Sequence, residues 1–154
     1  SLFLICYSCL MKKGEDYIGV CVVYFCHDGK GNFIMAKRSP KTRDEHGVWD
    51  IGGGGLEFGD TVEDTIKKEI KEEYCTDVQK IEFLGHRDIH RVHQGKKTHW
   101  IGLDFKVLVT PEQVKIGEPE KFEGLEWFRL ENYPKDNSHS QFPKFLSLYK
   151  DKLI

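Results

Sequence analysis

Three carboxylates within five residues are the clearest chemical feature of this sequence. Glu69, Glu72 and Glu73 stand at i, i+3 and i+4 in a segment whose apolar residues recur with a helical period. At about 100° per residue, Glu69 and Glu73 fall over the same sector as the apolar side chains, with Glu72 beside them. Like charges at this spacing destabilise a helix, so we expect a cation to compensate them. Mg²⁺ fits, because it favours a few carboxylates, waters and substrate phosphate oxygens.

A run of four glycines, 52–55, precedes this segment. A backbone without side chains can approach a ligand closely, and this run leads towards the amino end of the expected helix. The alternative is that the three glutamates form a solvated acidic face, paired through Lys68 and Lys71. That alternative leaves the glycine run and the inward placement of the acids unexplained.

The acids need a helix to position them, and the pattern predicts one over 62–74. Thr61 with Asp64 forms a capping-box pattern at its start, and apolar side chains four residues apart form its buried stripe. The remaining elements alternate in type, which predicts an α/β layered sandwich. We expect strands over 17–26, 33–37, 81–90, 101–109 and 123–129, a turn at Gly95, a surface loop over 39–47 and a closing helix over 142–149.

Length and composition describe one ordinary globular domain. The chain has 154 residues, 39% hydrophobic and 31% charged, with a formal net charge of -2. The charge balance gives no global attraction to nucleic acid polymers or anionic membranes. Five scattered cysteines indicate reduced thiols and the cytoplasm rather than a disulfide framework. The apolar stretch 2–10 is too short to span a bilayer and does not have the pattern of a signal peptide.

The stretch from Gly54 to Thr76 resembles the signature box of the Nudix hydrolases, G-x5-E-x7-R-E-U-x-E-E-x-G-U, where U is aliphatic. The spacing is intact over the whole box. The segments 49–54, 55–61, 118–123 and 126–128 resemble flanking motifs of MutT-like nucleotide pyrophosphatases. The departures are Gly52, Asp60, Lys68, Cys75 and Thr76. Lys68 keeps a cation without the planar fork of arginine, and Cys75 is expected to end the helix differently from glycine.

The resemblance implies a fold, a reaction and a set of metal ligands. The fold is a Nudix-type α/β/α sandwich with a mixed sheet between helices, spanning 17–154 after an N-terminal extension over 1–16. The reaction is hydrolysis of a nucleoside diphosphate linked to a group X, with Mg²⁺ or Mn²⁺. By motif position, Glu69, Glu72 and Glu73 are the metal ligands together with the Gly54 carbonyl. Glu69 is the leading candidate for the base, with Glu123 and then Glu120 as alternatives from a later loop.

Further residues are assigned to substrate binding or to support of the site. Lys37 and Arg38 resemble a basic pair that contacts phosphate, although a solvated strand end explains them equally well. The backbones of Gly53, Gly54 and Gly55 are expected to meet the substrate. Glu57 and Asp60 are expected to orient the helix and Lys68 rather than to bind the metal directly, although both could still serve as outer-shell ligands.

Several weaker signals have two readings each. The Cys6-x-x-Cys9 spacing suits zinc, but apolar flanks favour plain thiols. Four histidines could be surface residues of the hairpin or could face the cleft, and three aromatic side chains could be packing or a stacking surface for a base. These residues are His86, His90, His93, His99, Trp100, Trp127 and Phe128.

Three functions remain open. The favoured one converts a nucleoside triphosphate to the monophosphate and pyrophosphate, which would cleanse the nucleotide pool. The second, within the same fold, cleaves ADP-ribose or a nucleotide sugar. The third is an inactive nucleotide-binding module, which the three intact glutamates argue against. The sequence leaves a homodimer open and indicates a small nucleotide as the partner rather than a nucleic acid or a membrane.

Overall fold

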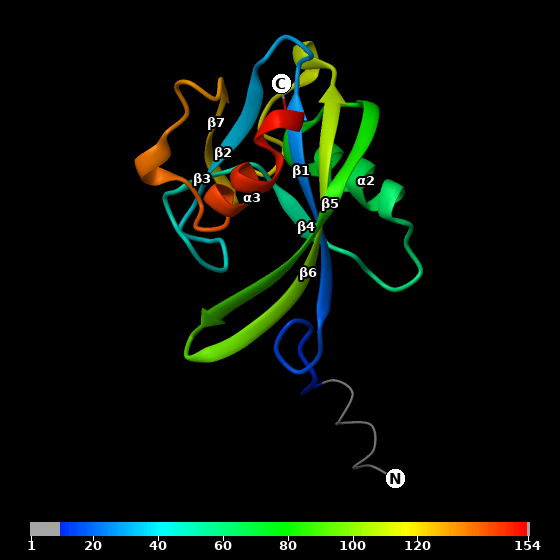
Figure 1. Ribbon diagram of the computed structural model, residues 1–154, viewed down its shortest axis with the longest axis vertical. Coiled ribbons are helices and arrows are strands. Elements are labelled where there is room, and N and C mark those ends of the chain that lie inside the picture. The colour runs from blue at the N-terminus through cyan, green and yellow to red at the C-terminus, as the bar shows by residue number, and fades with distance from the viewer. Residues whose placement is uncertain (1–9, 154) are drawn as a thin grey trace.

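The computed structural model describes residues 10–153, which form a seven-stranded mixed sheet with helices on both faces (Figure 1). The order along the sheet is β3-β2-β1-β6-β5; β4 pairs with β1 and β7 with β2. β1 and β6 are parallel, and every other pairing is antiparallel. The strands are β1 (Gly19–His27), β2 (Phe33–Arg38), β3 (Trp49–Asp50), β4 (Gly53–Gly55), β5 (Val78–His93), β6 (Lys96–Val109) and β7 (Phe122–Phe128).

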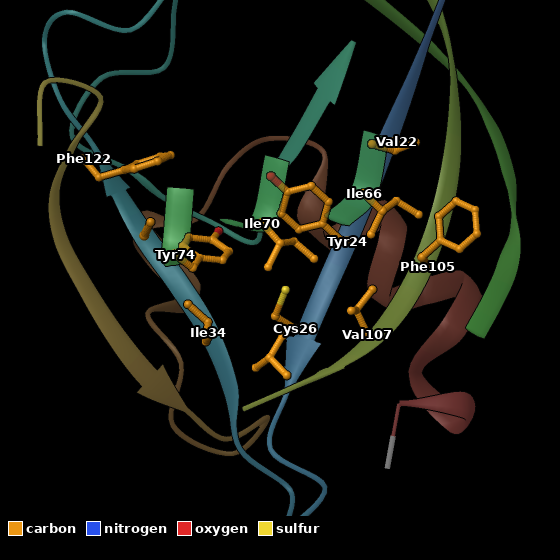
Figure 2. Close-up of a cluster of buried hydrophobic side chains, with 12 residues drawn as sticks. Val22, Tyr24, Cys26, Ile34, Ile66, Ile70, Tyr74, Phe105, Val107 and Phe122 are labelled. Atoms are coloured by element: carbon orange, nitrogen blue, oxygen red, sulfur yellow. The ribbon is translucent and has the colours of Figure 1, made fainter. Parts of the chain in front are cut away.

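Two helices cover the sheet, one on each face. Helix α2 (Val62–Tyr74) packs on a core cluster that includes Tyr24 and Ile34 (Figure 2). Helix α3 (Phe142–Tyr149) packs on a second cluster that includes Phe25 and Met35. Neighbouring residues of one strand serve opposite faces because side chains alternate along a strand. The predicted α/β/α sandwich with a mixed sheet between helices is therefore confirmed.

Helix α2 has the bounds that the sequence predicts. The Thr61 hydroxyl accepts a hydrogen bond from the Asp64 amide at 3.1 Å, as expected of a cap. The expectation for Cys75 is wrong, because Cys75 adopts the left-handed conformation, with φ 57°, and its amide bonds to the Lys71 carbonyl. Two further amides satisfy the last carbonyls: Lys115 donates to Tyr74 at 3.1 Å and Gly117 donates to Glu73 at 2.9 Å. These bonds from outside the helix hold a non-glycine residue in the strained cap.

The predicted pairing of the 81–90 and 101–109 segments is confirmed, and both strands are longer than expected. They form the β5–β6 ribbon, which continues past the other strands to its turn at Gly95 (Figure 1). The expected strands did not include the glycine run, yet Gly53–Gly55 forms the strand β4 against β1. A Cβ at Gly53 would lie 2.8 Å from the Val22 carbonyl oxygen, so the close pairing needs glycine. Strand propensity does not reveal such a strand, since glycine is depleted in ordinary strands.

The described part of the N-terminal segment packs against the start of β6. Lys13 donates to the Leu56 carbonyl at 3.0 Å, and the His99 amide donates to the Gly14 carbonyl at 2.8 Å. The boundary between an extension and the domain at residue 17 stays a prediction. Cys6 and Cys9, with the zinc spacing, lie outside the described residues. Within residues 10–153, no helix is both long enough and apolar enough to cross a membrane.

Candidate active site

A cavity of about 460 Å³ opens between the glycine strand β4, the β5–β6 ribbon and the start of α3. Glu73 reaches it from α2, and the loop after β2 contributes Lys41 and Asp44. Lys121, from the segment before β7, lies on its rim. Elements distant in the sequence therefore meet around one space, with carboxylate, cationic and apolar walls.

Glu73 is the most unusual acid of the cavity. It is 3% exposed, and its Oε2 has no hydrogen-bond partner in the described part of the chain. Burial raises its pKa from 4.5 to about 8; the Tyr24 hydroxyl opposes this rise and the charge of Glu69 adds to it. A buried carboxylate without a partner is unfavourable unless something charged satisfies it. A divalent cation coordinated by oxygen ligands fits this orphaned atom.

Glu69 lies one turn before Glu73 and packs on the glycine strand. A Cβ at Gly54 would lie 2.8 Å from the Glu69 Cδ, so a glycine at this position lets the carboxylate rest against the backbone. Glu69 is half-buried, and burial followed by the charge of Glu72 raises its pKa. The structure thus brings together the Gly54 backbone and the two acids that the sequence predicted as principal metal ligands.

Glu72 differs from the other two acids because its side chain is exposed. Two other groups of three ligating side chains have their ligand atoms within 4.8 Å of one another, Asp44 with Glu45 and His139, and Asp88 with His90 and His99. The oxygens of Glu69, Glu72 and Glu73 are not gathered this closely in the described structure. Repulsion between like charges gives a physical reason for their separation.

The predicted basic pair divides between two places. Arg38 lines the cavity, with its guanidinium 3.2 Å from Asp44 and 3.7 Å from Asp50. Lys37 lies 3.7 Å from Glu123, and both side chains are partly exposed outside the cavity wall. The strand alternation explains the split, since neighbouring residues of β2 point to opposite faces.

Glu57 and Lys121 are two further charged residues with ion-pair partners. Glu57, expected to orient the helix and Lys68, pairs with Lys13 at 3.2 Å rather than with Lys68, and its effect on the helix stays a prediction. Lys121 belongs to the segment 118–123 that resembles a flanking motif; it lies near Glu69 and Glu73 and pairs with Glu118 at 3.1 Å. Burial lowers the pKa of Lys121, but Glu118, Glu73 and Glu69 together raise it by more. In the sequence, the position of Lys121 among acidic residues before a strand was the one feature that indicated a place near the site.

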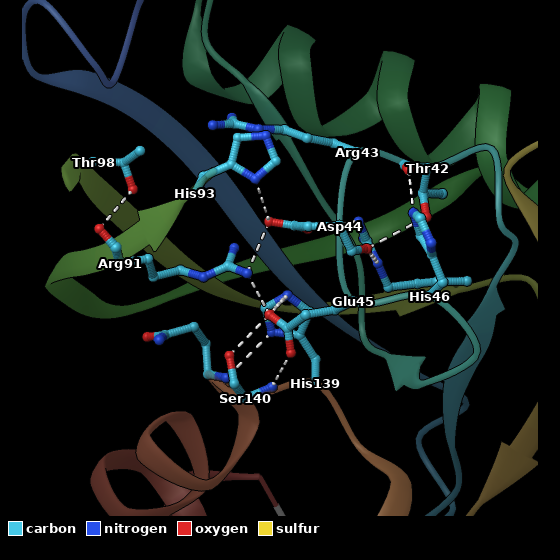
Figure 3. A network of polar contacts seen from close by, with 12 residues as sticks. Thr42, Arg43, Asp44, Glu45, His46, Arg91, His93, Thr98, His139 and Ser140 are labelled. Atoms are coloured by element: carbon cyan, nitrogen blue, oxygen red, sulfur yellow. Dashed lines mark hydrogen bonds and ion pairs between the residues drawn. The ribbon is translucent and has the colours of Figure 1, made fainter. Parts of the chain in front are cut away.

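Loop 39–47 is fixed to the rest of the cavity wall by a polar network that sequence reasoning missed (Figure 3). Arg91 of β5 donates to Asp44 at 2.8 Å and also bonds Glu45. Glu45 further accepts from the Ser140 amide at 2.7 Å and lies 2.9 Å from the His139 ring. Every carboxylate in this network has a cationic or hydrogen-bonding partner.

The α3 side of the cavity holds a buried ion pair. Arg87 donates to Asp104 at 2.7 and 3.0 Å, and the Tyr149 hydroxyl donates to the same carboxylate at 2.8 Å. The Arg87 guanidinium carbon lies 5.6 Å from the centre of the Phe145 ring. The wall is therefore apolar with a fixed cation, a surface suited to a flat, polar ring.

The histidines and aromatic residues singled out from the sequence divide between the two faces of the sheet. His93 and Trp100 line the cavity. Trp127 packs with the α2 core, while Phe128 stacks edge-on against Trp49 at 5.3 Å. His86 and His90 are exposed on the opposite face of the ribbon from Arg87. Of these side chains, only His93 and Trp100 are placed to meet a ligand in this cavity.

Comparison with known proteins agrees with this geometry. The NUDIX domain family matches residues 17–149, so the chain belongs to the NUDIX family. The chain is 27% identical over 108 residues to the NAD-capped RNA hydrolase NudC of Pseudomonas putida (strain GB-1). The match covers 68% of this chain and 35% of that protein, so the chain spans about a third of its relative's length.

Solved structures show the same fold. A MutT NUDIX hydrolase from Burkholderia pseudomallei superposes with a TM-score of 0.74 at 22% identity, covering 86% of this chain and 98% of that one. The NUDIX domain of Shewanella oneidensis NrtR, solved with ADP ribose, gives 0.70 at 15% identity, covering 99% and 97%. The MutT protein of Methanosarcina mazei Go1 gives 0.69 at 18% identity, covering 88% and 94%.

Proposed function

We propose that the protein hydrolyses a nucleoside diphosphate linked to a group X, with a nucleoside triphosphate as the first candidate substrate. The products would be the monophosphate and pyrophosphate. The observation that carries the proposal is the buried, unpartnered carboxylate of Glu73 beside Glu69 and the Gly54 backbone. An acid kept in this state is unfavourable for folding and is typical of functional sites.

Glu69, Glu72, Glu73 and the Gly54 carbonyl would hold Mg²⁺ or Mn²⁺. When bound, the cation would neutralise the diphosphate and acidify a water. Glu73 would contribute a ligand oxygen from the buried side, while the exposed Glu72 would contribute one from the solvent side. Lys121 and Arg38 would meet phosphate oxygens from the rim, since both line the cavity.

Glu69 is the better candidate for the base that accepts a proton from the attacking water. Its pKa is raised by burial and by Glu72, which makes the carboxylate a stronger base. Glu123 lies outside the cavity wall and beside Lys37, which supports Glu69 over the later loop. Glu120 is exposed, and its backbone carbonyl is bonded to the Ser39 hydroxyl.

A second candidate is cleavage of ADP-ribose or a nucleotide sugar. The structural neighbour solved with ADP ribose and the NAD-capped RNA hydrolase NudC both favour it. A cavity of about 460 Å³ with an apolar end beside Phe142 and Phe145 has room for a base distant from the acids. The cytoplasm is the compartment that we propose, in agreement with free thiols at Cys21, Cys26 and Cys75.

The test is a substrate panel of nucleoside triphosphates, ADP-ribose and nucleotide sugars, each with Mg²⁺, with Mn²⁺ and with excess chelator. Release of pyrophosphate from a triphosphate indicates the first candidate, and release of AMP from ADP-ribose the second. Glu69→Gln should lower turnover with either substrate, and Glu123→Gln is its matched control. Equal turnover with chelator, or a larger loss in Glu123→Gln, would contradict the assignment.

A further inference from the structure

A second cluster of metal-ligating side chains lies on the solvent face of the β5–β6 ribbon. His90 and His99 stand directly opposite each other on the two strands, with ring centroids 4.3 Å apart. Asp88 is two residues along β5, on the same face, and its Oδ1 lies 3.0 Å from the His99 Nε2. The ligand atoms of all three lie within 4.8 Å of one another.

The cluster is separate from the Nudix site. Side chains alternate along β5, so Arg87, Ile89 and Arg91 face the cavity while Asp88 and His90 face away from it. Its composition is also different, since two imidazoles and one carboxylate favour Zn²⁺ and similar transition metals, whereas Mg²⁺ favours oxygen ligands alone.

The geometry suits a small, tightly coordinating ion. Zinc bonds to imidazole nitrogen at about 2.0–2.1 Å, which places tetrahedral ligand atoms about 3.3 Å apart. The observed 3.0 Å between Asp88 and His99 is close to this spacing. Paired strands fix the backbones of all three residues, so little order is lost on binding.

The surroundings leave room for further ligands. His90 and His99 line a shallow hollow together with Glu15 and Asp16 of the N-terminal segment. The carboxylate of Glu15 is paired with Lys96 at 3.9 Å and with Arg43 at 3.7 Å, so water in the hollow would supply the further ligands. The other three-residue group, Asp44 with Glu45 and His139, offers no such opening, because Arg91 and Ser140 already bond its oxygens.

We propose that Asp88, His90 and His99 form a binding site for a divalent transition metal such as Zn²⁺, with open positions towards the hollow. The ion would join β5 to β6 where no third strand of the described structure pairs with the ribbon. Pairing of β6 with β1 begins at Trp100, and beyond it the two strands contact the rest of the fold through Arg91, which bonds Asp44 and Glu45, and through the His99 amide, which donates to the Gly14 carbonyl. Isolated two-stranded ribbons are marginally stable, so a cross-link there stabilises the fold.

The test is calorimetric titration of the full chain with Zn²⁺ in excess Mg²⁺, which keeps the Nudix acids occupied. Cys6→Ser and Cys9→Ser form the background, since those thiols are alternative zinc ligands. We expect one Zn²⁺ per chain and a melting temperature raised by about 5 °C or more at a hundredfold excess over Kd. Absence of binding in this background would overturn the proposal.

Two histidine variants test the ligand set. Loss of a metal ligand should weaken binding at least as much as loss of an outer partner, so His99→Gln should weaken it about tenfold or more. His86→Gln, on the same face of β5 but outside the group of three, is the matched control and should leave binding within about twofold. Equal weakening in both, or none in His99→Gln, would contradict the site. Unchanged circular dichroism of His99→Gln without metal confirms that it folds.

Discussion

Glu73 and Asp44 line the same cavity, and they differ in how their charge is balanced. Asp44 lies within reach of Arg38 and Arg91, at 3.2 and 2.8 Å, and its neighbour Glu45 is bonded by the His139–Ser140 segment. Glu73 is more deeply buried and has an oxygen without a partner among the described residues. The balanced acids fix a loop, whereas the unbalanced acid is available to a ligand. Acidity alone therefore does not identify the end of the cavity where we propose that the metal binds.

The largest expected effect is on the stability of the metal-free protein against pH. The folded pKa of Glu73 is about 8 and its ordinary value is 4.5, so between these values the folded state binds one more proton than the unfolded state. Stability from this group is present below about pH 4.5 and is lost as pH rises towards 8, by about 5 kcal/mol in all. Urea denaturation in chelator, from pH 5 to pH 9, measures it.

Glu73→Gln is the reference for this experiment. An amide side chain neither gains nor loses a proton in this pH range. The difference in unfolding free energy between wild type and variant should therefore show the whole pH dependence that we assign to Glu73. Asp44→Asn keeps Glu73, so its unfolding free energy should follow the same pH course as that of wild type. A parallel pH course for wild type and Glu73→Gln would show that Glu73 is not the cause.

The second-largest effect is expected on activity, where Glu73 and Asp44 should differ. Glu73→Gln removes a proposed metal ligand, and kcat/KM with Mg²⁺ should fall by about 10²–10³-fold. Asp44→Asn, which keeps the side chain's size in the cavity wall, should change kcat/KM by less than about tenfold. Steady-state kinetics on the best substrate of the panel measures both. A larger loss in Asp44→Asn would reverse the roles given to the two acids.

Removing the arginine that pairs with Asp44 and Glu45 should destabilise the fold. In Arg91→Met, Asp44 and Glu45 lose a shared partner, and the unfolding free energy should fall by about 2 kcal/mol, since the pair is partly screened by solvent. Arg43→Met is the control, because its pair with Glu15 is at 3.7 Å and more exposed. It should change stability by less than about 0.5 kcal/mol. Equal losses by urea denaturation would mean that charge balance does not stabilise the loop.

The smallest effect is expected at Glu72. Its side chain is exposed, so water replaces much of what Glu72→Gln removes, and kcat/KM should fall by about tenfold. In a titration of activity against metal, the Mg²⁺ concentration that gives half-maximal activity should be higher for Glu72→Gln than for wild type. A loss as large as that of Glu73→Gln would show that burial does not rank the three acids.

Much of the sheet and the acidic helix could be predicted from local patterns. The bounds of α2, its buried stripe and the inward placement of Glu73 follow from a 3.6-residue period, which needs no tertiary information. The bonds of Arg91 to Asp44 and of Ser140 to Glu45 join residues 47 and 95 positions apart, so no local pattern reveals them. The strand β4 was missed for another reason, since its glycines have no side chains to form a pattern.

The end of α2 has a consequence for how substrate preference can change. The backbone at Lys115 and Gly117 bonds the last carbonyls of the helix, and a Cβ at Gly117 would lie 2.0 Å from the Glu72 carbonyl oxygen. Gly117 is therefore intolerant of substitution, while Glu118 and Lys121, directly after it, are a surface ion pair beside the acids. Exchanging only these outer side chains would alter the field over a bound phosphate and leave the helix unmoved. Natural selection can therefore change the charges that face a bound phosphate at this position while the fold stays the same.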